Sequence, residues 1–268
     1  MKKLLTLGVL LFSVFLLSAI IGFSIPEGGQ VSWHNSTRHN ATAPKTMDGN
    51  LGAMAGNITY VNITAVGISR TWAGYYGNVS GTLVLQTFGG SNMYSWTMAA
   101  PYGKVLASNS TISDWTGVYC WNTSVATAQG LHISEWNTKY GANDEDYDSI
   151  NNTFSPSGSF ETFYIGNKEF GHNLAGTDDD SCCPMIQLYN KSGVGQGTNY
   201  QEIILQEGAQ GAANPQPALI YVSIINSSAY GFDGTQIDFQ MIVPDDGHGT
   251  DADTDTYYFY VELEAGPT

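Results

Sequence analysis

The stretches QIDFQMIVP (residues 236–244) and TYYFYVELE (residues 256–264) decide the fold class. Every second residue is apolar, which is the period of a β-strand with one buried face. In the first stretch Ile237, Phe239, Met241 and Val243 face inward, with Asp238 and Gln240 toward solvent, and in the second Tyr257, Phe259, Val261 and Leu263 share a face. An acidic loop separates the two stretches, so we predict a terminal antiparallel hairpin.

Similar signals occur along the preceding chain. Residues 56–69 are rich in β-branched side chains, and residues 74–109 divide at the turn sequences GGSN and PYG, which predicts a β-meander. Residues 159–170 predict a hairpin that turns at Gly166 and Asn167. Further strands are expected in residues 184–193, 200–208 and 218–225, and a short helix within 124–140. We therefore predict an all-β fold, a β-sandwich of the immunoglobulin-like or jelly-roll-like kind.

The N-terminus has the charge order of a secretory signal. Lys2 and Lys3 precede an uncharged apolar run at residues 4–24, which predicts either a signal peptide cleaved after Ser24 or a retained anchor helix. Residues 25–54 are polar and irregular, so we interpret them as an arm or linker. Residues 55–268 then form the β-sandwich, as one unit or as two packed subdomains divided near 125–150. The membrane is expected to be a partner only through residues 4–24, if they are uncleaved.

Charge and motifs exclude several functions. The net charge is −15, with only nine Lys and Arg, which makes nucleic acid an unsuitable partner. The sequence contains no GxSxG or HExxH motif, and the five histidines lack paired spacing. We therefore predict that the protein is not an enzyme.

Ten sequons indicate an N-glycosylated, extracellular protein. They begin at Asn35, Asn40, Asn57, Asn62, Asn78, Asn109, Asn122, Asn151, Asn190 and Asn226. In an oxidising exterior, the three cysteines favour one disulfide, between Cys120 and either Cys182 or Cys183, because adjacent cysteines rarely bond each other.

Three acidic clusters are candidate cation sites, at residues 144–148, 178–180 and 245–255. The third is the most specific, since carboxylates on a glycine-containing loop can converge on a hard cation such as Ca²⁺. Its candidate ligands are Asp245, Asp246, Asp251, Asp253 and Asp255. The loop lacks the EF-hand register, and the alternative is a solvated loop whose carboxylates maintain solubility.

The block TWAGYYGNVSGTLVLQ (residues 71–86) and the terminal stretch from Gly231 resemble a recurrent type of archaeal secreted, N-glycosylated surface protein. The resemblance extends from about residue 56 to residue 264. It implies an archaeal cell-surface location, a β-rich fold and a disulfide between Cys120 and Cys183. Cys182 departs from the pattern, and the resemblance implies no catalytic residues.

Two functions follow from these features. The first is an extracellular structural glycoprotein that self-assembles into a surface filament or layer as a homo-oligomer. In this hypothesis residues 29–34 of the arm lend a strand to an open sheet edge of the next subunit. The alternative is a monomeric cell-surface adhesin that binds glycans through exposed tyrosines, such as Tyr75 and Tyr76 or those at 257–260.

Overall fold

The computed structural model describes residues 25–32, 55, 60, 69, 71–121, 133–154, 159–171, 183–190, 200–207, 218–227, 229–245 and 255–264. Strands dominate and helices are few, which confirms the all-β prediction. In the described part of the chain, no helix is long and apolar enough to cross a membrane. The predicted signal or anchor at residues 1–24 lies outside the described residues.

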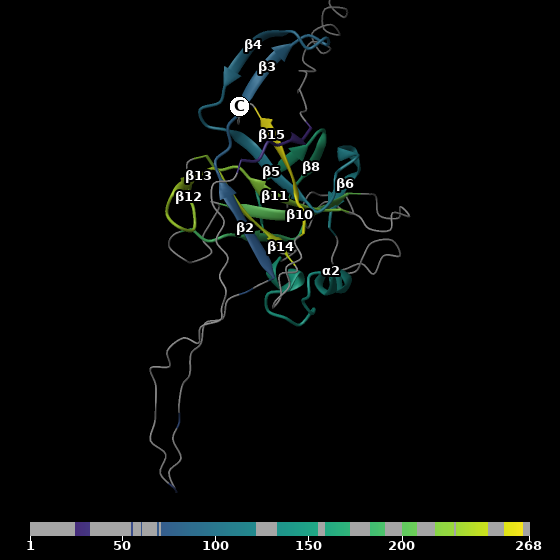
Figure 1. The fold of residues 1–268 in the computed structure, drawn as a ribbon, viewed down its shortest axis with the longest axis vertical. Helices are drawn as coiled ribbons and strands as arrows, with labels where there is room; N and C mark the ends of the chain where they lie inside the picture. Colours follow the sequence, from purple (N-terminus) through teal and green to yellow (C-terminus); the bar gives the residue numbers. More distant parts are fainter. Residues whose placement is uncertain are drawn as a thin grey trace, which may run out of the picture.

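The main sheet is antiparallel and has the strand order β1–β15–β5–β11–β10–β6, with β9 pairing β10 beside β6 (Figure 1). The strands are β1 (Glu27–Gly28), β5 (Tyr102–Ser108), β6 (Val118–Cys120), β9 (Met185–Gln187), β10 (Gln201–Glu207), β11 (Leu219–Ile224) and β15 (Tyr258–Glu264). Strands from before and after residues 125–150 are therefore interleaved in one sheet. The central strands β5, β10 and β11 are buried along most of their length.

One face of the main sheet is covered by a two-stranded sheet and two helices. β14 (Phe239–Pro244) pairs with β2 (Trp72–Gly77) and packs on β11. The helices α2 (Ile133–Lys139) and α3 (Ile150–Thr153) pack on the same face. The core between them is rich in aromatic rings, including Trp136, Tyr140, Phe154 and Tyr221.

The opposite face is covered by the hairpin of β7 (Phe163–Ile165) and β8 (Lys168–Phe170). Ile165 lies opposite Lys168, so the two-residue turn is Gly166 and Asn167, as predicted. Gly166 has φ +58°, a conformation that glycine adopts without steric cost. Burial on both faces explains why β10 and β11 are continuous apolar runs rather than alternating ones.

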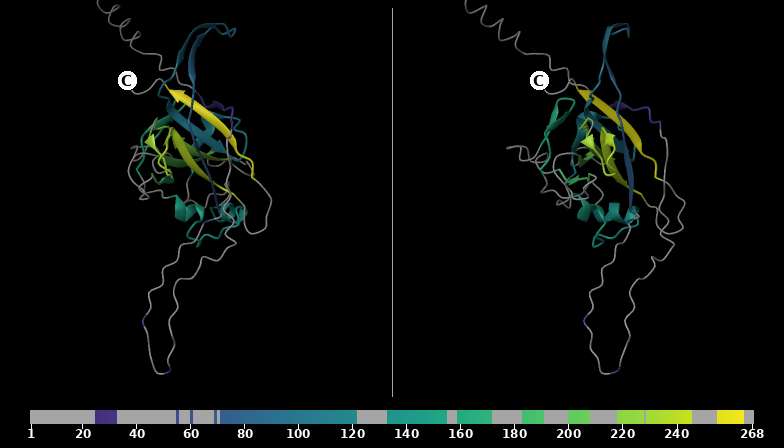
Figure 2. Two further views of the ribbon diagram at one scale, coloured as in Figure 1. Left: turned by 60° about the vertical axis from the view of Figure 1, so that its left-hand side comes forward. Right: turned by 90° about the vertical axis from the view of Figure 1, so that its left-hand side faces the viewer.

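The remaining elements are short. A 3₁₀-helix, η1 (Trp115–Gly117), precedes β6, and β12 (Ala229–Tyr230) pairs with β13 (Gln236–Ile237) just before β14. The hairpin of β3 (Thr82–Gln86) and β4 (Asn92–Thr97) extends beyond the rest of the described fold in each view (Figures 1 and 2).

Two predicted pairings are wrong. β14 and β15 do not form a hairpin, because β14 pairs with β2 while β15 pairs with β5 and β1. The meander at residues 74–109 is also wrong, since only β3 and β4 pair with each other there. Local alternation identifies a strand but not its partner, and here the partners are distant in sequence.

Face assignments on the last strands are partly confirmed. Tyr257, Phe259, Val261 and Leu263 all pack on the aromatic core, as expected. Asp238 and Gln240 were expected to face solvent, but both are buried. The Gln240 amide donates a hydrogen bond to the Tyr189 carbonyl, and Asp238 accepts one from the Val79 amide, so neighbouring loops cover this face.

The predicted polar arm at residues 25–54 begins with a strand. Glu27 and Gly28 pair with Val261 and Tyr260, and the Gly29 amide donates to the Phe259 carbonyl at 2.9 Å. The start of the arm therefore lies on the β15 edge of its own main sheet, and the stretch from residue 33 onward lies mostly outside the described residues.

Candidate functional site

One face of the β3–β4 hairpin is apolar. Leu83 lies opposite Trp96 and Leu85 opposite Tyr94, so these four side chains share one face. The Tyr94 and Trp96 rings meet edge to face with centroids 4.9 Å apart. The turn is closed by hydrogen bonds between Thr87 and Ser91, and Gly90 adopts φ +83°. Hydrogen bonds within the turn therefore close the hairpin, and its four apolar side chains lie on one face.

Large apolar side chains of this hairpin are exposed. The exposed fraction is 50% for Leu85, 60% for Tyr94, 49% for Trp96, 77% for Met93 and 111% for Phe88. An isolated two-stranded hairpin is marginally stable in water, and several large apolar side chains exposed together mark an interaction surface. We define residues 82–97 as the hairpin surface.

The hairpin surface lies in the longest uncharged run of the chain. No charged residue occurs from residue 71 to residue 103, in a chain with 24 acidic residues. Within the described residues, β3 and β4 pair only with each other, so each leaves one outer edge without a strand partner. Natural edge strands are usually protected by charges or proline, and these two carry neither.

The two described ends of the predicted calcium loop approach the same side chain. Asp245 follows β14 and Asp255 precedes β15, and both carboxylates raise the pKa of Tyr140. Asp246, Asp251 and Asp253 lie outside the described residues. Among the side chains that are described, no three His, Cys, Asp or Glu groups gather as a metal site.

The tyrosines beside this loop form a buried cluster. Burial is the main reason why the pKa of Tyr140 rises to about 12, with smaller contributions from Asp255 and Asp245. The Tyr257 hydroxyl donates to the Pro244 carbonyl and lies 3.4 Å from the Tyr140 hydroxyl. The first tyrosine of the 257–260 stretch therefore belongs to the core, which weakens its predicted role in stacking on sugars.

The carboxylates of the first acidic cluster, at residues 144–148, accept hydrogen bonds from other residues of the protein. Asp148 accepts hydrogen bonds from the hydroxyls of Ser69 and Thr71 and fixes the start of β2. Asp144 accepts from the Asn137 amide at 2.7 Å, and Asp146 accepts from the Asn143 backbone amide at 2.8 Å. These carboxylates therefore stabilise turns. The second predicted acidic cluster, at residues 178–180, lies outside the described residues.

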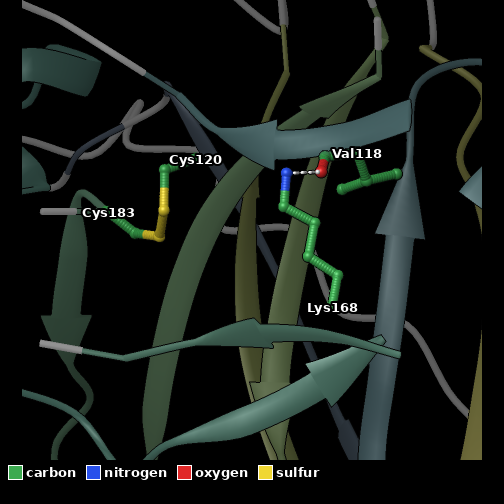
Figure 3. Close-up of a disulfide and its surroundings, with 4 residues drawn as sticks. All are labelled: Val118, Cys120, Lys168 and Cys183. Atoms are coloured by element: carbon green, nitrogen blue, oxygen red, sulfur yellow. Dashed lines mark hydrogen bonds between the residues drawn. A yellow bond between two sulfur atoms is a disulfide. The ribbon is translucent and has the colours of Figure 1, made fainter. Parts of the chain in front are cut away.

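Cys120 and Cys183 form a disulfide, as the resemblance implied (Figure 3). Cys120 ends β6, and Cys183 lies two residues before β9. Both short strands pair with β10, so the disulfide joins two segments of one sheet edge. Lys168 of β8 donates a hydrogen bond to the Val118 carbonyl at 2.8 Å, which connects the β7–β8 hairpin to β6 at this edge.

The described sequon asparagines differ in their surroundings. Asn78 is exposed just after β2. Asn109 is half-buried, with its side-chain amide donating to the Tyr140 hydroxyl and its carbonyl accepting from the Leu219 amide. Asn151 is likewise half-buried and donates to the Asp144 carbonyl, while Asn190 and Asn226 are half-buried. The sequons outside the described residues are Asn35, Asn40, Asn57, Asn62 and Asn122.

Sequence reasoning missed two features. Residues 82–97 belong to the stretch predicted as a β-meander, and the long uncharged run was a visible signal that this segment is unusual. Lys104 was not singled out, because a lone lysine is ordinarily a solvated surface residue.

No family model, curated protein or solved structure matches the chain.

Proposed function

We propose that this chain is the N-glycosylated, extracellular subunit of a surface filament or layer, in which copies contact one another through the hairpin surface. The observation that carries the proposal is the exposed, uncharged and apolar β3–β4 hairpin on a strongly acidic protein. Its fold is a variant of the β-sandwich, and residues 1–24 direct export.

Charge favours a second copy as the occupant of the hairpin surface. The net charge is −15, and it becomes −17 without Lys2 and Lys3 of the signal. Two copies therefore repel each other over most of their surface, and the repulsion is weaker where the uncharged hairpin of one copy meets a different surface of the next. Burying one large apolar side chain contributes about 1.5–3 kcal/mol, so a few such contacts can exceed a screened repulsion.

The free edges of the hairpin add a second source of contact. Strand addition to an open edge supplies main-chain hydrogen bonds, and the apolar face supplies burial. A contact that joins two different surfaces builds an open chain of subunits unless the rotation closes a ring. We also propose that Ca²⁺ at the 245–255 loop lowers the repulsion between copies.

Tyr94 and Trp96 give the adhesin hypothesis its best support. Exposed aromatic rings can stack on sugars, and this pair belongs to β4, whose hairpin with β3 extends beyond the rest of the described fold (Figure 1). An adhesin would bind glycans as a monomer. The test below distinguishes the two functions, because only the structural subunit needs the hairpin for association between copies.

The experiment uses sedimentation velocity of the mature glycosylated chain over a range of concentrations. Replacing Leu85 and Trp96 with lysine should abolish association, although it reduces the net negative charge. The matched control replaces Tyr147 and Tyr230, which are exposed elsewhere, with lysine and should associate like the wild type. Association that survives in the hairpin variant, or a wild type that stays monomeric with Ca²⁺, would refute the proposal.

A further inference from the structure

Lys104 is a fully buried lysine in the middle of the main sheet. It lies on β5, directly opposite Glu262 of β15, and its side chain is 1% exposed. Its amine nitrogen is 3.2 Å from Glu262 Oε2 and also contacts Glu264 Oε1. One lysine therefore lies between two carboxylates, on the sheet face that β7 covers.

Ionised side chains are expensive at such a position. Removing an ammonium and a carboxylate from water costs several kcal/mol per ion, and their mutual attraction often fails to offset that cost. Phe163 of β7 lies over the site, with its ring centroid 5.9 Å from the Lys104 nitrogen. A neutral amide in place of the Lys104 and Glu264 charges would remove the penalty for those two groups and keep the two strands joined.

We propose that Lys104 and Glu264 condense into an intramolecular isopeptide bond, with Glu262 as the group that carries the proton. The inference rests on the geometry of this site and stands apart from the proposed assembly. The sheet supplies the proximity, because adjacent strands hold the amine and the carboxyl group in contact, and effective molarities of oriented groups reach about 10⁵–10⁸ M.

The step conserves atoms and charge. The Lys104 ammonium gives one proton to Glu262, and the neutral amine attacks the Glu264 carboxyl carbon. Glu262 returns that proton to a Glu264 oxygen, the nitrogen loses a second proton to the same oxygen, and one water molecule leaves as the amide forms. Glu262 ends as a carboxylate that accepts a hydrogen bond from the new amide N–H.

Exposure assigns the two roles. Glu264 is 30% exposed, so the released water has a path to solvent, whereas Glu262 is 3% exposed and suits a proton carrier shielded from water. Burial disfavours the charged forms of both the ammonium and the carboxylate, which favours transfer of the proton from Lys104 to Glu262. The bond would join β5, which follows the hairpin surface in the chain, to the C-terminal strand β15.

Mass spectrometry of the reduced, unglycosylated mature chain tests the proposal directly. The folded wild type should weigh one water molecule less than its sequence requires. Trypsin should fail to cleave after Lys104, and residues 71–139 should be recovered attached to residues 192–268. Full mass with cleavage after Lys104, or a link from Lys104 to Glu262, would overturn the assignment.

Variants identify the role of each group. Lys104→Arg and Glu264→Ala should restore the full mass, and Glu262→Gln should remain mostly unlinked although both partners are present. Lys139→Arg, on an exposed face of α2, is the matched control and should link like the wild type. A Glu262→Gln chain that links at the wild-type rate would show that Glu262 carries no proton.

Discussion

Removing the disulfide should destabilise the sheet edge formed by β6 and β9. Each strand has only three residues, and the two meet near Ile204, whose carbonyl accepts from the Trp121 amide and whose amide donates to the Pro184 carbonyl. Such short strands contribute few hydrogen bonds of their own. We therefore expect the covalent link to provide much of the stability of this edge.

The expected loss of folding stability follows from the length of the chain segment that the disulfide closes into a loop. Cys120 and Cys183 are 63 residues apart, and the chain-entropy model gives about 4 kcal/mol for a loop of that length. For a domain of this size, 1 kcal/mol corresponds to about 2–4 °C in melting temperature. Replacing both cysteines with alanine should lower the melting temperature by roughly 8–16 °C, as an upper limit.

The assay is thermal unfolding followed by circular dichroism, with hydrogen exchange of the β9 amides. The double variant is made in a Cys182→Ala background, and Cys182→Ala alone is the control that retains the bond. Exchange at β9 should accelerate more than exchange at β11, which lies deeper in the sheet. If the double variant melts at the control temperature with unchanged β9 exchange, the disulfide does not hold this edge.

Four other outcomes are expected. Gly103→Ala should lower the melting temperature strongly, because φ is +132° and an added Cβ would lie 2.0 Å from the Glu262 carbonyl oxygen; a soluble variant with wild-type melting would contradict the close approach. Burial raises the pKa of Glu202 above its ordinary 4.5, so wild-type stability relative to Glu202→Gln should fall by about 1.4 kcal/mol per pH unit as pH rises from 4.5 to the folded-state pKa, and parallel denaturation curves across pH would refute this. Millimolar Ca²⁺ should raise the melting temperature and chelator should reverse it, whereas an unchanged melting curve supports a solvated loop. Glycopeptide mapping of native protein should find Asn78 occupied and Asn109 unmodified, and the reverse pattern would contradict their surroundings.

Local patterns predicted the elements better than their partners. Gly166 and Asn167 specify their turn by themselves, because two residues contain all the chemistry that a tight hairpin needs. The strand of residues 239–244 was predicted from alternation alone. Its pairing with β2, far earlier in the chain, depends on how the whole core closes, and no local signal encodes it.

The candidate sites were predictable to a similar, limited extent. The adjacency of Cys182 and Cys183 correctly suggested that Cys120 pairs with one of them. That inference needs only the chain order and the geometry of a disulfide bond. The exposure of Trp96 and the burial of Lys104 were not predictable, because both contradict the usual behaviour of their residue types. They depend on which surfaces the rest of the fold covers.

Cryo-electron microscopy of the native cell surface tests the central claim most directly. The map of an assembled filament or layer should place residues 82–97 of each subunit against a neighbouring copy, with Leu85 and Trp96 buried there. Subunits whose β3–β4 hairpins all face solvent, or a surface on which the protein occurs only as separate monomers, would contradict the account.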